Sequence, residues 1–253
     1  MTTPEAGVPE LDGAPLFLLD AVPEADELLV DGDEGRHAVD VLRLTAGEHV
    51  RVGDGNGTVA DGSVLSAGPD GLRVSVTSRF EVPPHDPEFV LVQALPKGDR
   101  GPLAVELATE LGVDRIVPWT ASRCVTRWRE DRVDRGLAKW RSAARAAAKQ
   151  SRRPRLPEVT EPMTTREVCG MLGDVDLAVV LHEQARRPLA ELTVPQAGTI
   201  AVVVGPEGGM TDGEVVAFRA AGGQAVRLGP EVLRTSTAGA ATLAALSLRT
   251  RWL

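Results

Sequence analysis

Two short segments of the chain share a Gly-Pro-Glu turn that directly follows an apolar run. In "TIAVVVGPEGGMTDGEV" the turn is Gly205–Glu207, and in "RLGPEVLRTSTAG" it is Gly229–Glu231. Glycine lets the backbone approach a ligand closely, whereas proline fixes φ and removes an N–H donor. A rigid wall of this kind suits a nucleoside, held edge-on by backbone N–H and C=O groups, better than a pyrophosphate.

The usual nucleotide-binding motifs are not present. A dinucleotide fold would show G-x-G-x-x-G after its first strand and an acid about 20 residues later, and a P-loop would end in GK[ST]. Here the glycine-rich turn lies deep in the chain, and the strand-like run "EFVLVQAL" ends in "PKGDRG". The two turns therefore favour a ligand other than a dinucleotide or a nucleoside triphosphate.

The elements around these turns predict how they are positioned. From residue 88 onward, strand-like runs (88–95, 113–119, 176–181, 199–204, 224–228) alternate with helical patterns (101–112, about 134–151, after Thr211, and 236–250). This alternation is typical of an α/β domain with a mainly parallel sheet, which binds ligands at the carboxyl ends of its strands. We therefore expect both turns, and the segment "VVLHEQA" at 179–185, to lie side by side at one edge.

The front of the chain has a different pattern. Residues 1–15 read as a loose acidic tail, and residues 16–84 contain short alternating strands, glycine-rich turns and one helix near 33–43. Prolines in "VPPHDP" (82–87) then predict a stiff hinge, because a residue before proline favours an extended backbone. The sequence predicts a small β-rich domain followed by an α/β domain at 85–253.

Composition narrows the class of protein. The chain has 253 residues, a net charge of −8, and two cysteines, Cys124 and Cys169, without a C-x-x-C partner. Neither a disulfide framework nor a zinc site is expected, and the histidine spacing predicts no metal. The N-terminus does not read as a signal peptide, and no apolar run is long enough to span a bilayer, so we expect a cytoplasmic protein without membrane contact.

Positive charge is concentrated in one part of this acidic chain. Residues 123–155 contain twelve Lys and Arg residues and three acids, a net charge of +9, so the other 220 residues carry −17. An isolated charge run is more often a solvated helix face. On a helical wheel, however, Trp140, Ala144, Ala147 and Ser151 form a small packing face, and a basic stripe lies beside it: Arg141, Arg145, Lys149 and Arg152. This arrangement favours a phosphate-binding surface for RNA.

The motifs together resemble a known family. "VVVGPEGGMTDGEV", "VRLGPEVLRTSTAGAATLAAL", "LPKGDR…ELATELGVDRIVPWTASRCVTRW" and "KWRSAARAAAKQSRRPRLPEV" resemble the RsmE family, 16S ribosomal RNA uridine-N3 methyltransferases of the SPOUT superfamily. The front domain resembles it too, through "GRHAVDVLRLTAGEHVRVGDGNG". The resemblance covers almost the whole chain after about residue 16.

The resemblance implies a fold, a cofactor and partners. The expected fold is a PUA-like β-barrel (16–84) that helps to grip RNA, followed by an α/β methyltransferase domain (85–253) threaded into a trefoil knot. The expected protein is a homodimer that uses S-adenosylmethionine to methylate 16S ribosomal RNA in the small ribosomal subunit. The residues expected to contact the cofactor are Leu181, His182, Glu183, Val204, Gly205, Pro206, Glu207, Gly208, Gly209, Leu228, Gly229, Leu233, Arg234, Thr235, Ser236 and Thr237.

Candidate catalytic and RNA-binding residues complete the hypothesis. Arg234 is the first candidate to stabilise negative charge on the uracil ring, with phosphate or dimer contact as the equally weighted alternative; Glu207 could accept the proton or shape its loop. Thr235 and Thr237 are expected to cap the last helix. The candidate RNA-binding residues are Arg43, Lys97, Arg100, Arg123, Arg141, Arg145, Lys149, Arg152 and Arg153.

The sequence departs from the family pattern and leaves alternatives open. Ser236 stands where the family often has an acid, and "AKQS" (148–151) replaces "AEQS". With four Phe, four Trp and no Tyr, a single-strand stacking platform is not expected, so RNA shape and phosphate charge should carry recognition. A tRNA ribose methyltransferase of the same superfamily and a non-enzymatic RNA-binding assembly factor remain the alternatives.

Overall fold

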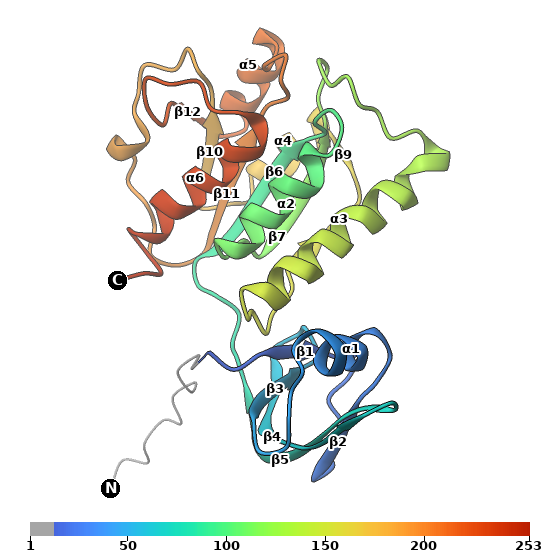
Figure 1. Ribbon diagram of the computed structural model, residues 1–253. Coiled ribbons are helices and arrows are strands. Elements are labelled where there is room, and N and C mark those ends of the chain that lie inside the picture. Colours follow the sequence, from blue (N-terminus) through green and yellow to red (C-terminus); the bar gives the residue numbers. More distant parts are fainter. Residues whose placement is uncertain (1–12) are drawn as a thin grey trace, which may run out of the picture. The chain divides into compact units, whose positions relative to one another are not determined.

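The computed structural model describes residues 13–253, which form two compact units (Figure 1). Of the described residues, the first unit comprises 13–84 and Ala148–Leu156, and the second comprises His85–Ala147 and Pro157–Leu253. Of the acidic tail expected at residues 1–15, all but the last three residues lie outside the described part. None of the helices in residues 13–253 combines the length and apolar character that crossing a bilayer requires.

The first unit is built on a five-stranded sheet in the order β1-β3-β4-β5-β2. β1 pairs with β3 in parallel, and the other pairs are antiparallel. Alternating apolar residues of β3 to β5 face a core that includes Phe17, Val52 and Leu72. Its elements are β1 (Leu16–Leu18), β2 (Glu27–Val30), α1 (Gly32–Arg36), the π-helical turn η1 (His37–Val41), β3 (His49–Gly53), β4 (Thr58–Gly68) and β5 (Gly71–Glu81). The short strands and the helix of the front part agree with the sequence pattern, and closure into a barrel stays a prediction.

A distant segment, Ala148–Leu156, completes the first unit. Lys149 Nζ lies 2.7 Å from Glu34 Oε1, and the Leu156 N–H donates to Gly55 O at 2.8 Å. The Arg155 guanidinium donates to Val82 O at 2.6 Å. No local pattern indicates this placement, because each of these contacts joins residues more than seventy positions apart.

The second unit contains the predicted parallel sheet, in the order β12-β10-β11-β6-β7-β8, with β9 paired to β7. Every strand pair in it is parallel. Its central strands are continuous apolar runs buried on both faces, as in other sheets covered by helices. The strands are β6 (Glu88–Ala94), β7 (Arg115–Thr120), β8 (Glu158–Val159), β9 (Met163–Thr164), β10 (Leu177–Leu181), β11 (Thr199–Val204) and β12 (Gln224–Val226).

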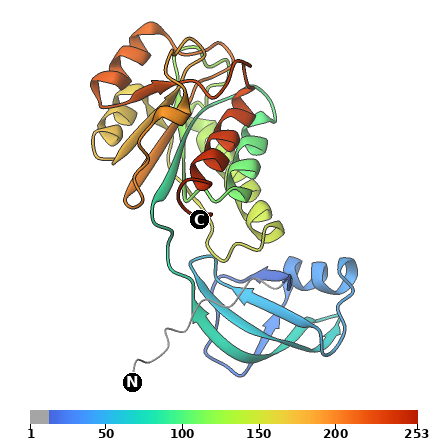
Figure 2. The same cartoon turned by 90° about the vertical axis from the view of Figure 1, so that its left-hand side faces the viewer.

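Helices cover both faces of this sheet (Figure 2). α2 packs with α6 on one face, and α4 packs with α5 on the other. The helices are α2 (Arg100–Glu110), α3 (Glu130–Gln150), α4 (Thr165–Leu172), the 3-10 turn η2 (Leu189–Glu191), α5 (Asp212–Ala220) and α6 (Thr235–Ser247). The sequence did not predict β8, β9 or α4, which are too short to show a clear hydrophobic period.

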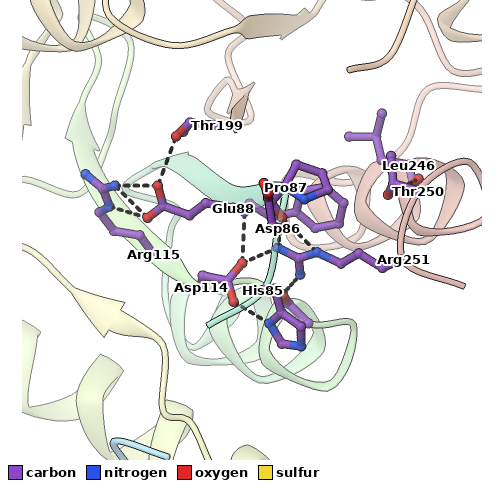
Figure 3. A network of polar contacts seen from close by, with 12 residues as sticks. His85, Asp86, Pro87, Glu88, Asp114, Arg115, Thr199, Leu246, Thr250 and Arg251 are labelled. Carbon is purple, nitrogen blue, oxygen red and sulfur yellow. Dashed lines mark hydrogen bonds and ion pairs between the residues drawn. The ribbon is translucent and has the colours of Figure 1, made fainter. Parts of the chain in front are cut away.

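A polar network joins the start of β6 to the C-terminal segment (Figure 3). Asp114 accepts hydrogen bonds from His85 Nδ1 (2.7 Å), the Phe89 N–H (2.9 Å) and the Arg251 guanidinium, which also donates to Pro87 O and stacks 3.7 Å from the Phe89 ring centre. Burial alone would raise the pKa of Asp114, but the hydrogen bonds and the Arg251 charge outweigh it and lower the pKa. The network therefore stabilises the fold through an ionised carboxylate.

This network predicts a pH-dependent stability. A carboxyl whose pKa is lowered by folding contributes stability above its unfolded pKa, about 3.9, and loses it as pH falls through the folded value. We expect Asp114→Asn to lower the free energy of unfolding at pH 7 by about 1–3 kcal/mol, and the difference from wild type to shrink toward pH 3. Urea denaturation at pH 7 and pH 3 measures this difference in unfolding free energy. Asp174→Asn, at an exposed aspartate, is the control. A difference that is constant with pH would contradict the role of the charge.

Candidate active site

Three loops meet at the carboxyl edge of the parallel sheet and enclose a cavity of about 610 Å³. They follow β10, β11 and β12, which are neighbours in the sheet. The loop after β11 is Gly205–Gly209, the loop after β10 starts at His182, and the loop after β12 ends at Arg234. The sequence therefore predicted correctly that the two Gly-Pro-Glu turns and the "LHE" segment would lie together.

Most of the residues expected around the cofactor line this cavity. Leu181, His182, Glu183, Val204, Gly205, Pro206, Glu207, Gly208, Gly209, Leu228, Gly229, Leu233, Arg234 and Thr235 do so. Ser236 and Thr237, the next residues along α6, do not line it. The wall also contains residues that the motifs did not indicate, among them Arg100, Met210 and Val226.

Glu207 connects the first Gly-Pro-Glu turn to the segment after β6. Its Oε1 accepts hydrogen bonds from the Lys97 N–H at 3.1 Å and from Arg100 Nη1 at 3.3 Å. Of the residues expected to bind RNA, Lys97 thus holds this loop through its backbone N–H and Arg100 through its guanidinium. These hydrogen bonds favour loop positioning over proton acceptance for Glu207.

Arg123, in the segment after β7, holds the same loop. Its Nη1 donates to Gly208 O at 3.1 Å and to Met210 O at 3.3 Å. A Cβ added at Gly208 would lie 3.3 Å from Arg123 Cβ. A side chain at Gly208 would therefore press on Arg123, and Gly209, with φ of +69°, makes the left-handed turn that closes the loop.

Thr235 ties the two Gly-Pro-Glu loops together. Its hydroxyl donates to Gly205 O at 2.8 Å and accepts from Gln93 Nε2 at 2.9 Å. The N-cap of α6 is Arg234, with no side-chain cap, so the expectation that Thr235 and Thr237 cap this helix is wrong. Thr235 lies one position too late to cap, and its hydroxyl is buried against the neighbouring loop.

Two residues that hold these loops, Gln93 and Glu214, were not predicted from the sequence. Gln93 is fully buried near the end of β6. The sequence feature that could have indicated it is a single polar residue in an otherwise apolar strand. Glu214 forms a capping box with Thr211 and accepts from the Ser122 N–H at 2.8 Å. Burial raises the pKa of Glu214, but these hydrogen bonds outweigh that effect and lower it. The sequence feature that could have indicated Glu214 is the T-x-x-E pattern directly after the glycine-rich turn.

Arg234 lies at the mouth of the cavity as an exposed side chain. Within the described residues, its guanidinium has no hydrogen-bond partner, whereas Arg100 and Arg123 are both engaged. His182 differs again, because its Nδ1 accepts from the Gln184 N–H at 3.3 Å within its own turn. Arg234 is thus a cavity cation that can reach an incoming substrate.

The basic stripe is less continuous than its helical wheel predicts. Trp140, Ala144 and Ala147 are buried as expected. α3 ends at Gln150, so Arg152, with φ of +57°, does not lie on the helix. Arg141 donates to Val159 O, and Lys149 pairs with Glu34. RNA binding stays a prediction for all nine candidates: Arg43, Lys97, Arg100, Arg123, Arg141, Arg145, Lys149, Arg152 and Arg153.

Metal ligation is not suggested by the side chains that the structure places. Across residues 13–253, no group of three or more His, Cys, Asp or Glu side chains is arranged to hold a metal ion. The cavity is instead walled by aliphatic side chains, backbone N–H and C=O groups, and a few charged groups. Such a composition is typical of sites for small organic ligands.

Comparison with known protein families gives two matches. Residues 84–247 match the RNA methyltransferase domain, and residues 30–77 match the RNA methyltransferase PUA domain. A curated relative in Mycobacterium tuberculosis, ribosomal RNA small subunit methyltransferase E, is 46% identical over 245 residues, which cover 94% of each chain.

Solved structures show the same architecture. Ribosomal RNA small subunit methyltransferase E from Neisseria gonorrhoeae, bound to S-adenosylmethionine, has a TM-score of 0.80 and 28% identity, and the match covers 94% of this chain and 98% of that one. A methyltransferase from Legionella pneumophila, also in complex with S-adenosylmethionine, has a TM-score of 0.81 and 26% identity, with 94% and 97% covered.

Proposed function

The chain belongs to the RNA methyltransferase family that includes ribosomal RNA small subunit methyltransferase E, and we propose that it methylates N3 of one uridine in 16S ribosomal RNA. It is an S-adenosylmethionine-dependent ribosomal RNA methyltransferase with a PUA domain. The proposal that uridine N3 is the methylated atom rests on the cavity at the sheet edge, with the cationic side chain of Arg234 at its mouth.

The cavity residues fit the cofactor. A volume of about 610 Å³ lies within the usual range for small-molecule sites, about 300–1,000 Å³. Leu181, Val204 and Leu228 offer apolar walls, and the glycine-rich loops expose backbone donors and acceptors to a nucleoside edge. When bound, S-adenosylmethionine supplies an electrophilic methyl group on a sulfonium.

Arg234 is the proposed catalytic residue. The N3 of uracil carries a proton, and its loss to solvent water leaves negative charge that spreads onto the carbonyl oxygens at C2 and C4. A guanidinium at the mouth of the cavity can donate hydrogen bonds to one of these oxygens as the charge develops. The alternatives are binding of a phosphate only or of the dimer partner. An Arg234 variant would then lose RNA affinity or dimer stability without a change in the rate of the chemical step.

Glu207 is a proposed positioning residue. Its Oε1 is already shared between the Lys97 N–H and Arg100, so the carboxylate fixes the turn that borders the cofactor. Orientation of this kind is a large part of catalysis for an in-line methyl transfer, because the nucleophile and the methyl group must be aligned.

Three finer features of the family are included in the proposal. The first is a knotted carboxyl-terminal region, as membership of this methyltransferase family implies. Exposed apolar side chains on the second unit, including Val232 (79%) and Leu248 (64%), support a homodimer, whose mass sedimentation velocity would measure. Action on ribosomal subunits is consistent with a cytoplasmic enzyme, which cell fractionation would test.

The direct test is to identify the product. The purified protein is incubated with S-adenosylmethionine and small ribosomal subunits that lack the modification, and the digested RNA is analysed by mass spectrometry. We expect 3-methyluridine at one site, and little product from short naked RNA, because shape and phosphate spacing carry recognition. Ribose-methylated nucleosides would favour a tRNA-type relative, and no methylation of any particle would favour an assembly factor; either would overturn the proposal.

A further inference from the structure

A second cavity, of about 490 Å³, lies in the same unit between the start of α2 and the first half of α3. Its floor is formed by Trp128 and Trp140, whose rings meet edge to face with centres 5.3 Å apart. The described residues that line it are all different from those that line the first cavity. Two of the four tryptophans of the chain are thus concentrated at one surface site.

Glycines allow both indoles to sit here. A Cβ at Gly136 would lie 2.5 Å from the Trp128 ring, and a Cβ at Gly101 would lie 2.7 Å from Trp140 Nε1. Trp128 therefore packs against the α3 backbone while remaining partly exposed, and Trp140 is 2% exposed. Within the described residues, the indole N–H of Trp140 has no hydrogen-bond partner, and it is not one of the fully buried atoms without a partner, so it is a donor that a ligand in the cavity can contact.

The rim of the cavity is cationic. Arg132, Arg135 and Lys139 line it, all with exposed side chains, and among the described lining residues Asp99 is the one carboxylate. Arg132 lies 3.8 Å from the exposed Asp131, a weak surface ion pair. An aromatic floor below a rim of cations is the arrangement that binds single-stranded nucleic acid, with a base on the ring and phosphate on the cations.

The two cavities flank the same helix start. Gly98, Asp99 and Gly101 line the second cavity, and Arg100 lines the first and donates to Glu207. A strand whose target base enters the first cavity would therefore have its neighbouring nucleotides within reach of the second.

We propose that this second cavity binds one nucleotide of the RNA strand next to the methylated uridine, with its base against Trp128 and its phosphate at Arg135 and Lys139. The proposal rests on RNA being the substrate, as in the proposed function. It adds base stacking to a protein whose composition, taken alone, predicts recognition by phosphate charge and shape. The indole N–H of Trp140 is a donor for a base carbonyl in this cavity.

The test uses fluorescein-labelled hexauridylate and fluorescence anisotropy at low salt. We expect the double variant Arg135→Ala/Lys139→Ala to weaken binding about tenfold and to flatten its salt dependence by about 0.7 for each phosphate that is no longer neutralised. Arg166→Ala/Arg219→Ala, which removes two exposed cations of α4 and α5 away from either cavity, is the matched control. Equal affinity of both double variants, or no binding by the wild type, would overturn the proposal.

A second readout isolates the stacking interaction. Hexauridylate should quench tryptophan emission of the wild type, and Trp128→Phe, which keeps an aromatic ring in the packing, should show less of that quenching. Unchanged quenching in this variant, or equally tight binding of uridine monophosphate alone, would refute a nucleotide site for an RNA strand.

The two proposals fail in different ways. If the wild type methylates subunits, but the Arg135→Ala/Lys139→Ala variant binds hexauridylate as tightly as the wild type, only the nucleotide site in the second cavity is excluded. If the variant binds hexauridylate more weakly as expected, but no particle is methylated, only the proposed reaction is excluded.

Discussion

Replacing Arg234 with alanine is expected to lower turnover by about 100- to 1,000-fold, the usual cost of removing one donor that stabilises charge in the transition state. The affinity for S-adenosylmethionine should change little, because the guanidinium acts on charge that develops on the uracil. Single-turnover rates on small ribosomal subunits, with calorimetry for the cofactor, separate the two quantities. Arg234→Lys keeps the charge but not the planar guanidinium, so its turnover should lie between those of the wild type and Arg234→Ala.

Glu207→Gln provides the comparison for this experiment. The amide oxygen still accepts from the Lys97 N–H and from Arg100, so replacing a positioning residue should reduce turnover only several-fold and leave the pH profile unchanged. A reduction as large as that of Arg234→Ala, with the acidic limb of the pH profile removed, would instead make Glu207 the proton acceptor. Unchanged turnover in Arg234→Ala would exclude that side chain from the chemical step.

Gly208→Val is expected to weaken binding of S-adenosylmethionine by about 100-fold or more. From the sequence alone, a side chain here is expected to enter the space of the ligand. The structure directs the added Cβ toward Arg123, 3.3 Å away, so the weaker binding would come from displacing the residue that holds Gly208 O and Met210 O. A few kcal/mol of overpacking strain is enough for this effect, since about 1.4 kcal/mol is a factor of ten.

The control for this variant is Gly170→Val. A Cβ at Gly170, in α4, meets no atom within 4 Å, so this change adds a valine without steric conflict. Calorimetric titration of both variants, with circular dichroism to check folding, gives the comparison. Wild-type affinity in a folded Gly208→Val protein would show that the Gly205–Gly209 loop does not border the cofactor.

The sequence predicted the features that depend on local pattern. Apolar runs alternating with helices indicated a parallel sheet, and the geometry of such a sheet then brought Gly205 and Gly229 to one edge although no local rule connects them. The start of α5 follows from the same kind of evidence, because Thr211 and Glu214 form a capping box that is visible in the sequence.

Features that depend on long-range packing could not be predicted in this way. The link from Gln93 to Thr235 joins residues 142 positions apart, and no periodicity reports such a hydrogen bond. The pairing of Lys149 with Glu34 similarly removes one cation from a stripe that a helical wheel treats as continuous. Counting aromatic residues also misses Trp128 and Trp140, because composition does not show that two of them meet.

The position of Ala148–Leu156 in the first unit affects the order in which the protein can fold during synthesis. Translation proceeds at about 5–20 residues per second, so this segment follows Pro84 out of the ribosome after a delay of roughly 4 to 14 seconds. During that interval Glu34 has not met Lys149, and Gly55 O has not met the Leu156 N–H. The amino-terminal unit is therefore finished only after the first strands and helices of the second have been made, and folding of the two is interleaved in time.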